Sequence, residues 1–312
     1  MPSSITHAYI AKDVYKNLTK KVKIKFKDIY IEDYKTYAQG PDIFYFYNII
    51  LPITKKSRDI IRFGHYIHNN KVNEFFINLC DKVKSSQDID QFAFLCGLVT
   101  HYQADSIIHP YINYKATIMR KKNLTRKDVH FILETYLDNY FITKNEKIEY
   151  KKFKVHEFCF NLNKKDSVIN LLNNSIKEVF DKENMGESYF KSLKDMKNFF
   201  KYLRYDPTGI KRELYRIINI FASRCFRDVR YLSYNFNLEN DDVYLNLKKK
   251  IWYNLDSKGL KSNESLLELY DKVIYKTKNM IEELYEYVYE NKDINLEKLF
   301  GNKSYSNGLE LK

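Results

Sequence analysis

The sequence predicts an all-α protein built as a multi-helix bundle. Only 8 Gly and 5 Pro occur in 312 residues, too few for the turns of a many-stranded sheet. Hydrophobic residues make up 44% of the chain, as in globular proteins, and long stretches rich in Lys, Glu, Leu and Tyr suit helices. No linker is long or rich in Pro and Ser. We therefore expect a single helical domain over residues 1–312.

Apolar residues recur three and four positions apart through long segments, the pattern of a helix with one buried face. These segments are 7–21, 70–83, 90–109, 126–142, 166–182, 188–204, 209–233, 241–254 and 263–290. Polar, Gly or Pro residues predict breaks at 39–42, 143–152, 205–209, 237–242 and 256–263, and in the tail from Gly301. The break at 143–152 is expected to be a surface loop.

Charge and cysteine content limit the class of protein. The net charge of +13 favours anionic partners such as a phospholipid surface or nucleic acid, although lysines spread over every solvated face give the same total. No secretory signal or apolar run of about 18–20 residues is present, so a soluble, cytoplasmic protein is expected. The four cysteines form no CxxC pair and are expected to be small buried hydrophobes: Cys80, Cys96, Cys159 and Cys225.

Two helical segments each carry a stripe of polar residues at four-residue spacing. His101, Asp105 and His109 lie in THYQADSIIHP, directly after the apolar run FAFLCGLV. Because Pro110 disfavours the α conformation at the residue before it, we expect the helix to end at His109. The second stripe, His130, Glu134 and Asp138, lies in HFILETYLD. Residues four apart share one face of a helix, so two antiparallel helices would bring these stripes together, as in metal sites of helical bundles.

Further ligand types lie upstream of these stripes. Asp42 follows the turn signal of Gly40 and Pro41, His65 and His68 precede a helical segment, and His7 lies near the start; six of the seven histidines thus precede residue 131. Zinc is bound by imidazole nitrogen and carboxylate oxygen, and one aspartate can bridge two ions. Each motif alone is more often a hydrogen-bonded or capping pair. The combination predicts a zinc site, with His65 and Asp138 as neighbours that support the ligands.

Five stretches carry a resemblance to a known family: MPSSITH, AQGPDIF, GHYIHNNKVNEFF, THYQADSIIHPYI and HFILE. In this order they resemble the zinc-dependent phospholipase C family, in particular its bacterial branch without a secretion signal. The likeness is specific over residues 1–142 and looser at IWYNLD and GNKSYSNGL. It implies an all-α bundle of the phospholipase C/P1 nuclease type, an architecture shared with S1/P1 nucleases. Residues 1–142 are then expected to carry the metal cluster and residues 150–312 to form additional packed helices.

The resemblance also implies zinc, two or three ions, and specific ligands. One ion would be held by Asp42, His68, His101 and Asp105, and a second by His109, His130 and Glu134. Asp105 would also reach a third ion near His7. Asp42 would double as the general base.

The expected activity is hydrolysis of a phosphodiester, by a metal-activated water attacking the phosphorus of a phospholipid or a related substrate. A peripheral contact with an anionic membrane is compatible with the basic charge, and nucleic acid is the less favoured partner. Two alternatives remain open at this stage: an S1/P1-like zinc nuclease or nucleotidase, and a non-catalytic helical protein that uses the metal for folding.

Overall fold

The fold is helical, as predicted. The computed structural model describes residues 4–49, 54–120, 125–222 and 241–311. Its longer helices are α1 (Ser4–Asn17), α2 (Lys20–Tyr37), α3 (Lys55–Ile67), α4 (Val72–Ser86), α5 (Ile89–Ile118), α6 (Arg126–Glu146), α8 (Asp166–Phe180), α9 (Met185–Asn198), α10 (Ile210–Ala222) and α12 (Leu266–Tyr289). Shorter pieces are η1 (Gly40–Phe46), η2 (Tyr150–Lys152), α7 (Val155–Phe158), η3 (Phe199–Arg204), α11 (Asp241–Tyr244) and α13 (Leu296–Phe300). No helix in the described ranges has both the length and the hydropathy that a membrane span requires.

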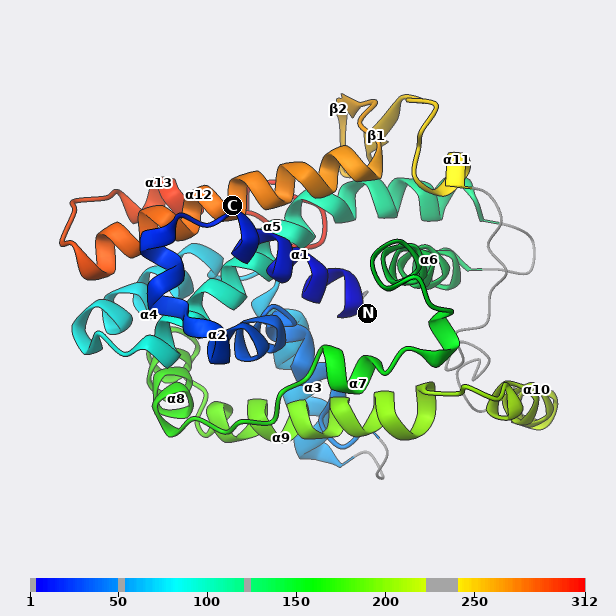
Figure 1. The fold of residues 1–312 in the computed structure, drawn as a ribbon, viewed down its shortest axis with the longest axis horizontal. Helices are drawn as coiled ribbons and strands as arrows, with labels where there is room; N and C mark the ends of the chain where they lie inside the picture. Colours follow the sequence, from blue (N-terminus) through cyan, green and yellow to red (C-terminus); the bar gives the residue numbers. More distant parts are fainter. Residues whose placement is uncertain (1–3, 50–53, 121–124, 223–240, 312) are drawn as a thin grey trace.

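Helix α5 is the centre of the bundle (Figure 1). Every residue from Phe92 to Ser106 is buried, so this half of the helix has no solvated face. Its most extensive contacts are with α2 and α12, and it also packs against α1, α4, α6 and α8. The polar stripe of α5 therefore lies in a buried environment, where it needs partners from the surrounding helices.

The later helices pack on the earlier ones. Helices α8 and α9 lie against α4 and η1, and α12 lies along α1, α4 and α5. The predicted segment 263–290 is α12, whose buried residues recur at three- and four-residue spacing from Leu266 to Val288. A capping box from Ser265 and Glu268 begins this helix. Three of the cysteines are buried and free, as expected: Cys80, Cys96 and Cys159. Cys225 lies outside the described residues.

Several boundaries differ from the prediction. The first segment is α1, which starts at Ser4 and ends at Asn17, and α2 and α3 were not predicted. The segment 188–204 starts earlier, at Met185, and its last turns form the π-helical η3. The loop predicted at 143–152 is shorter, because α6 runs to Glu146. Of the segment 209–233, the part from residue 223 on lies outside the described residues.

The prediction of a helix over 241–254 is wrong. Only α11 is helical there, and the chain then turns through Asn246 and Lys249, both with positive φ, into strand β1 (Trp252–Asn254). This strand pairs antiparallel with β2 (Ser257–Ser262), where a break had been predicted. The indole of Trp252 is buried against the ring of Tyr111 on α5, at 5.6 Å between centroids. Burial of this one large side chain fixes an extended strand where apolar periodicity indicated a helix.

The prediction that the helix ends at His109 is also wrong. Helix α5 continues to Ile118 with Pro110 inside it. Proline has no N–H to donate to the carbonyl four residues earlier, which is that of Ser106. The backbone of Gly308 lies at this carbonyl: a Cβ on Gly308 would sit 2.2 Å from the Ser106 oxygen. The C-terminal segment thus packs closely on α5 where the proline interrupts the hydrogen-bond ladder.

Candidate metal centre

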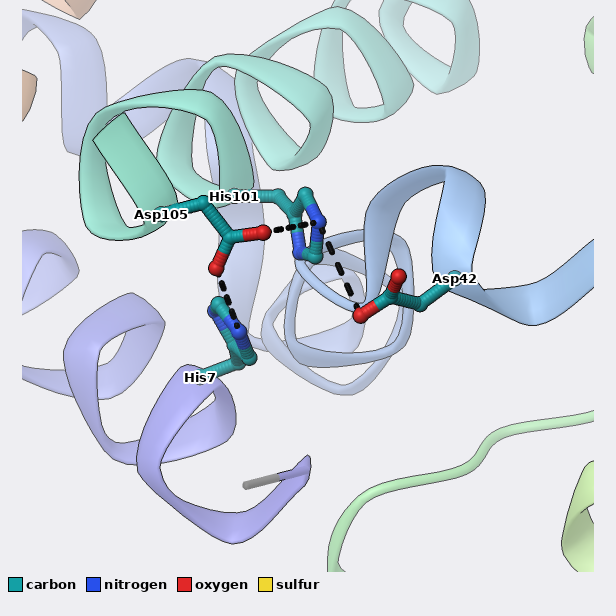
Figure 2. Close-up of side chains that lie close together, drawn as sticks. All are labelled: His7, Asp42, His101 and Asp105. Carbon is teal, nitrogen blue, oxygen red and sulfur yellow. Dashed lines mark ion pairs between the residues drawn. The ribbon is translucent and has the colours of Figure 1, made fainter. Parts of the chain in front are cut away.

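All eight residues predicted as ligands lie close together in the structure. They come from five elements: His7 from α1, Asp42 from η1, His68 from the end of α3, His101, Asp105 and His109 from α5, and His130 and Glu134 from α6. Figure 2 shows four of them, with the imidazoles of His7 and His101 and the carboxylates of Asp42 and Asp105 pointing toward one another. Six of the eight side chains are buried; His109 and His130 are partly exposed.

Asp105 lies between histidines of different helices. Its Oδ1 is 3.3 Å from Nε2 of His7, and its Oδ2 is 3.2 Å from Nε2 of His101. Oδ2 is also 3.6 Å from Nδ1 of His109. Each oxygen of this carboxylate therefore faces a different imidazole, which is the arrangement a bridging ligand requires.

Asp42 contacts the cluster from the side of η1. Its Oδ1 lies 3.1 Å from Nε2 of His68 and its Oδ2 lies 3.8 Å from Nε2 of His101. The turn before it depends on Gly40, which has φ of +57°. A Cβ at this position would meet Cγ of His101 at 2.3 Å, so only glycine allows η1 to pass so close to the imidazole.

A second group of ligand types lies beside the first. Oε1 of Glu134 is 2.9 Å from Nε2 of His130 and 3.5 Å from Nε2 of His109. The candidate ligand atoms of these three residues lie within 4.8 Å of one another, as do those of His7, Asp42, His101 and Asp105. Because His109 and His130 are partly exposed, this group is the more accessible of the two.

Three of the histidines place Nδ1 against a backbone carbonyl oxygen. The pairs are His68 with Gly64, His101 with Ala38 at 3.1 Å, and His109 with Tyr305 at 2.9 Å. A carbonyl oxygen only accepts hydrogen bonds, so Nδ1 carries the proton in each case. With Nδ1 held in this way, Nε2 of each ring points toward the carboxylates, which is how backbone carbonyls orient imidazoles for a metal.

The C-terminal segment closes over the cluster, a feature that sequence reasoning missed. The ring of Tyr305 packs against the ring of His68, at 4.9 Å between centroids, and against that of His101, at 5.8 Å. Its backbone N–H donates to the carbonyl of His68, and its own carbonyl accepts from His109. Tyr305 thereby contacts histidines of both groups. No ligand chemistry marks this residue in the sequence, and only the likeness at GNKSYSNGL pointed to this stretch.

Asp138 and His65 lie beside the cluster and not in it. Oδ1 of Asp138 accepts hydrogen bonds from the backbone N–H of Thr6, at 2.9 Å, and from its hydroxyl, at 3.0 Å. Asp138 therefore holds the residue before His7, consistent with the supporting role expected for it. The ring of His65 packs on Tyr45, at 4.4 Å between centroids.

The charges of the cluster depend on one another. Burial opposes the ionisation of Asp105, but the charges of His101 and His109 outweigh burial and hold the pKa of this carboxyl well below its ordinary value. Burial likewise opposes the protonation of His109, while Asp105 and Glu134 raise its pKa to about 9. In the absence of a metal, Asp105 and Glu134 thus retain the proton on His109. A divalent cation would replace that proton.

Three observations show that zinc fits this donor set. Two ligands bonded at 2.0–2.1 Å to a tetrahedral ion lie about 3.3 Å apart, and the nitrogen–oxygen separations around Asp105 and Asp42 run from 3.1 to 3.8 Å. Nε2 of His68 and of His101 is buried, and no described residue makes a well-aligned hydrogen bond to it. A cavity of about 20 Å³ lies between Asp105, His109 and Glu134, enough for one water-sized occupant.

The structure differs from the prediction in one detail of grouping. His7 joins Asp42, His101 and Asp105 in one set of mutually close atoms. Its ring stacks on that of His101, at 4.5 Å between centroids. His68 lies at the edge of this set and reaches it through Asp42. His7 is therefore as close to the first group as the residues that had been assigned to it.

Comparison with known proteins identifies the family. Searches of curated proteins and of solved structures gave no match. The family model of zinc dependent phospholipase C matches residues 6–190, more than half of the 312-residue chain. The matched region contains all eight clustered residues, whereas Tyr305 lies beyond it. The chain therefore belongs to the zinc-dependent phospholipase C family.

Proposed function

We propose that this protein is a zinc-dependent phosphodiester hydrolase that cleaves phospholipids as a phospholipase C does. The observation that carries the proposal is the position of Asp105, whose two oxygens face imidazoles from α1 and α5 inside a buried cluster. Membership of the family supports zinc as the metal and phospholipid as the substrate class. A nuclease on the same scaffold is the alternative that the substrate test distinguishes.

We assign the ligands as follows. Asp42, His68, His101 and Asp105 hold one ion. His109, His130 and Glu134 would hold a second, and His7 with Asp105 would hold a third if one binds. Asp105 is the shared ligand, because its two oxygens diverge toward His7 and His101.

When bound, zinc lowers the pKa of a water molecule and offsets the charge of the phosphoryl oxygens. Burial opposes the ionisation of Asp42, but the close contact with His68 and the charge of His101 hold its pKa below the ordinary value. The Asp42 carboxylate is therefore ionised at neutral pH and can accept the proton of the attacking water, so we assign it as the general base. The carbonyls behind His68, His101 and His109 keep these rings in one orientation through the reaction.

The packing of the later helices supports a single domain. Helix α9 covers η1, which carries Asp42, α8 packs on α9, and α12 lies along α1 and α5, which carry His7 and Asp105. We propose that the helices after residue 150 hold the elements of the cluster in register. The cytoplasmic location expected from the sequence stays a prediction.

A substrate panel tests the function. Zinc-loaded protein is incubated with mixed micelles of phosphatidylcholine, and release of phosphorylcholine and diacylglycerol is measured. Single-stranded DNA is the second substrate, and chelator-treated protein and Asp42→Asn are the controls. We expect zinc-dependent release of both products that Asp42→Asn loses. Cleavage of the DNA alone would favour a nuclease, and no turnover of either substrate by zinc-loaded protein would contradict the proposal.

A further inference from the structure

A small hairpin at the edge of the bundle exposes large apolar side chains. Strands β1 and β2 project from the edge of the bundle, beside the C-terminal part of α5 and the start of α12 (Figure 1). Four side chains at this projection are exposed and are called the hairpin patch: Ile118 at 54%, Ile251 at 54%, Tyr253 at 43% and Leu260 at 54%. Large apolar groups that gather on a surface mark an interaction site more often than single ones do.

The fold presents the hairpin patch outward. Trp252 and Asn254 are buried on the inner face of β1, so Tyr253 between them points away from the bundle. The strand pairing passes from Tyr253 with Lys261 directly to Asn254 with Ser257, so residues 258–260 bulge out of the ladder and carry Leu260. Ile118 follows Tyr114 by one helical turn, and the Tyr114 ring lies 6.2 Å from that of Tyr253.

Exposed lysines lie beside these apolar groups. The segment 243–262 contains five lysines and one aspartate, within a chain of net charge +13. Four of these lysines are exposed: Lys248, Lys249, Lys250 and Lys261. Lys248 and Lys249 pair with Asp242 and Glu268, and Lys261 lies directly opposite Tyr253 in the sheet. Exposed apolar side chains beside Lys250 and Lys261 match an anionic phospholipid surface, whose headgroups attract lysine and whose acyl boundary accepts apolar groups.

The hairpin patch is connected to the metal centre. Helix α5 carries Asp105 and His109 and continues to Ile118, about 14 Å beyond His109 at 1.5 Å per residue. Asn307 makes two hydrogen bonds to the turn of the hairpin. The carbonyl oxygen of Asn307 accepts from Nδ2 of Asn254 at 2.8 Å, and Nδ2 of Asn307 donates to Asp256 at 2.9 Å. Asn307 lies two residues after Tyr305, which packs on the cluster. Helix α5 and the C-terminal segment with Tyr305 and Asn307 thus link the hairpin patch to the metal centre.

We propose that the hairpin patch docks the protein on the surface of an anionic phospholipid bilayer. The proposal rests on the proposed function, because a phospholipase must reach a substrate that lies in a membrane. The apolar side chains enter the headgroup region, and the lysines pair with lipid phosphates around them. Docking places the C-terminal end of α5 at the membrane. The metal centre is then separated from the membrane by the stretch of α5 from His109 to Ile118.

Vesicle binding tests the proposal with a matched control. The full-length protein is sedimented with vesicles of phosphatidylcholine and phosphatidylglycerol in equal parts, in chelator so that no lipid is consumed. The variant Ile251→Ser/Tyr253→Ser/Leu260→Ser removes the apolar groups of the hairpin. Ile24→Ser is the control, because Ile24 on α2 is 64% exposed and also lies among lysines. We expect the triple variant to bind at least about tenfold more weakly, since bilayer binding scales with the apolar area buried.

Wild-type binding should also weaken as salt rises, because the lysine contacts are screened. The control variant should bind as the wild type does. The proposal is overturned if the triple variant binds vesicles as tightly as the wild type, if Ile24→Ser causes the same loss, or if the wild type does not bind anionic vesicles.

A soluble chromogenic phosphodiester separates this proposal from the proposed function. We expect the triple variant to hydrolyse the soluble substrate at the wild-type rate and vesicle lipid more slowly. Loss of vesicle binding with no hydrolysis of either substrate by any form would support docking and contradict the phosphodiesterase. If the wild type and the triple variant hydrolyse both substrates at equal rates, the result would support the phosphodiesterase and contradict docking.

Discussion

The replacement Asp105→Asn removes the one carboxylate that faces both sides of the first ligand group. Asparagine keeps one oxygen, so it can still face His7 or His101, but its amide nitrogen cannot ligate a metal at the other. Loss of a group that only orients a ligand already costs about 10–100-fold in metal affinity. Loss of a shared ligand should therefore cost at least about 100-fold, or about 2.7 kcal/mol of zinc binding.

This loss has a thermal consequence. Zinc that binds only the folded chain raises the free energy of unfolding, and about 2.7 kcal/mol corresponds to roughly 4 °C in the unfolding midpoint of a 312-residue chain. We expect chelator to lower the midpoint of the wild type by about this amount more than it lowers that of Asp105→Asn, which keeps the second ligand group. Zinc content, measured by elemental mass spectrometry, should fall by at least one ion per chain in the variant, and turnover should fall on the order of 10²-fold or more.

Asp138→Asn is the matched control, because this buried carboxylate faces Thr6 and an asparagine oxygen can accept the same two hydrogen bonds. It should retain the zinc content, the chelator response and the activity of the wild type. An Asp105→Asn variant with full zinc content and full turnover would refute the assignment of Asp105 as a shared ligand.

Four further predictions concern the groups that shape the cluster. Gly40→Ala should lower zinc content, because its Cβ would lie 2.3 Å from Cγ of His101. Elemental analysis of the purified variant measures this, and a wild-type zinc content would show that the close approach is unimportant. Tyr305→Ala should weaken zinc binding by about 10-fold or more in a competition titration, because the ring of Tyr305 packs on His68. Tyr305→Phe keeps this ring and should bind zinc as the wild type does. Equal losses in both variants would assign the effect to the hydroxyl. Zinc affinity should rise with pH up to about 9, because His109 must lose its proton to bind the metal, and a flat titration would exclude this linkage. In the metal-free protein, the same raised pKa gives stability that is complete below pH 6.5 and is lost as the pH rises through about 9, which urea unfolding would detect.

Sequence patterns predicted the long amphipathic helices well. Segments 166–182 and 263–290 correspond closely to α8 and α12. One face of each helix is buried, so its apolar residues recur three and four positions apart in the sequence. The pattern failed at 241–254, where a single buried indole on a short strand decides the conformation. It also failed at Pro110, where a glycine almost two hundred residues later lies against the carbonyl that the proline cannot use. Both errors come from tertiary contacts that no local pattern contains.

The candidate site was more predictable than its surroundings. Its eight residues carry ligand chemistry at helical spacing or in motifs of the family, and all eight lie close together in the structure. The residues that support them carry no such signal. Gly40 is required by the closeness of an imidazole, and Tyr305 acts through its backbone and its ring. Their roles follow from distances between segments far apart in the chain.

The most direct test of the central claim is a crystal structure of the zinc-loaded protein with anomalous scattering measured at the zinc absorption edge. We expect one peak within about 2.0–2.2 Å of ligand atoms of Asp42, His101 and Asp105, and another at the same distance from His109, His130 and Glu134. Anomalous peaks elsewhere in the chain, with these six side chains bonded only to one another, would contradict the account.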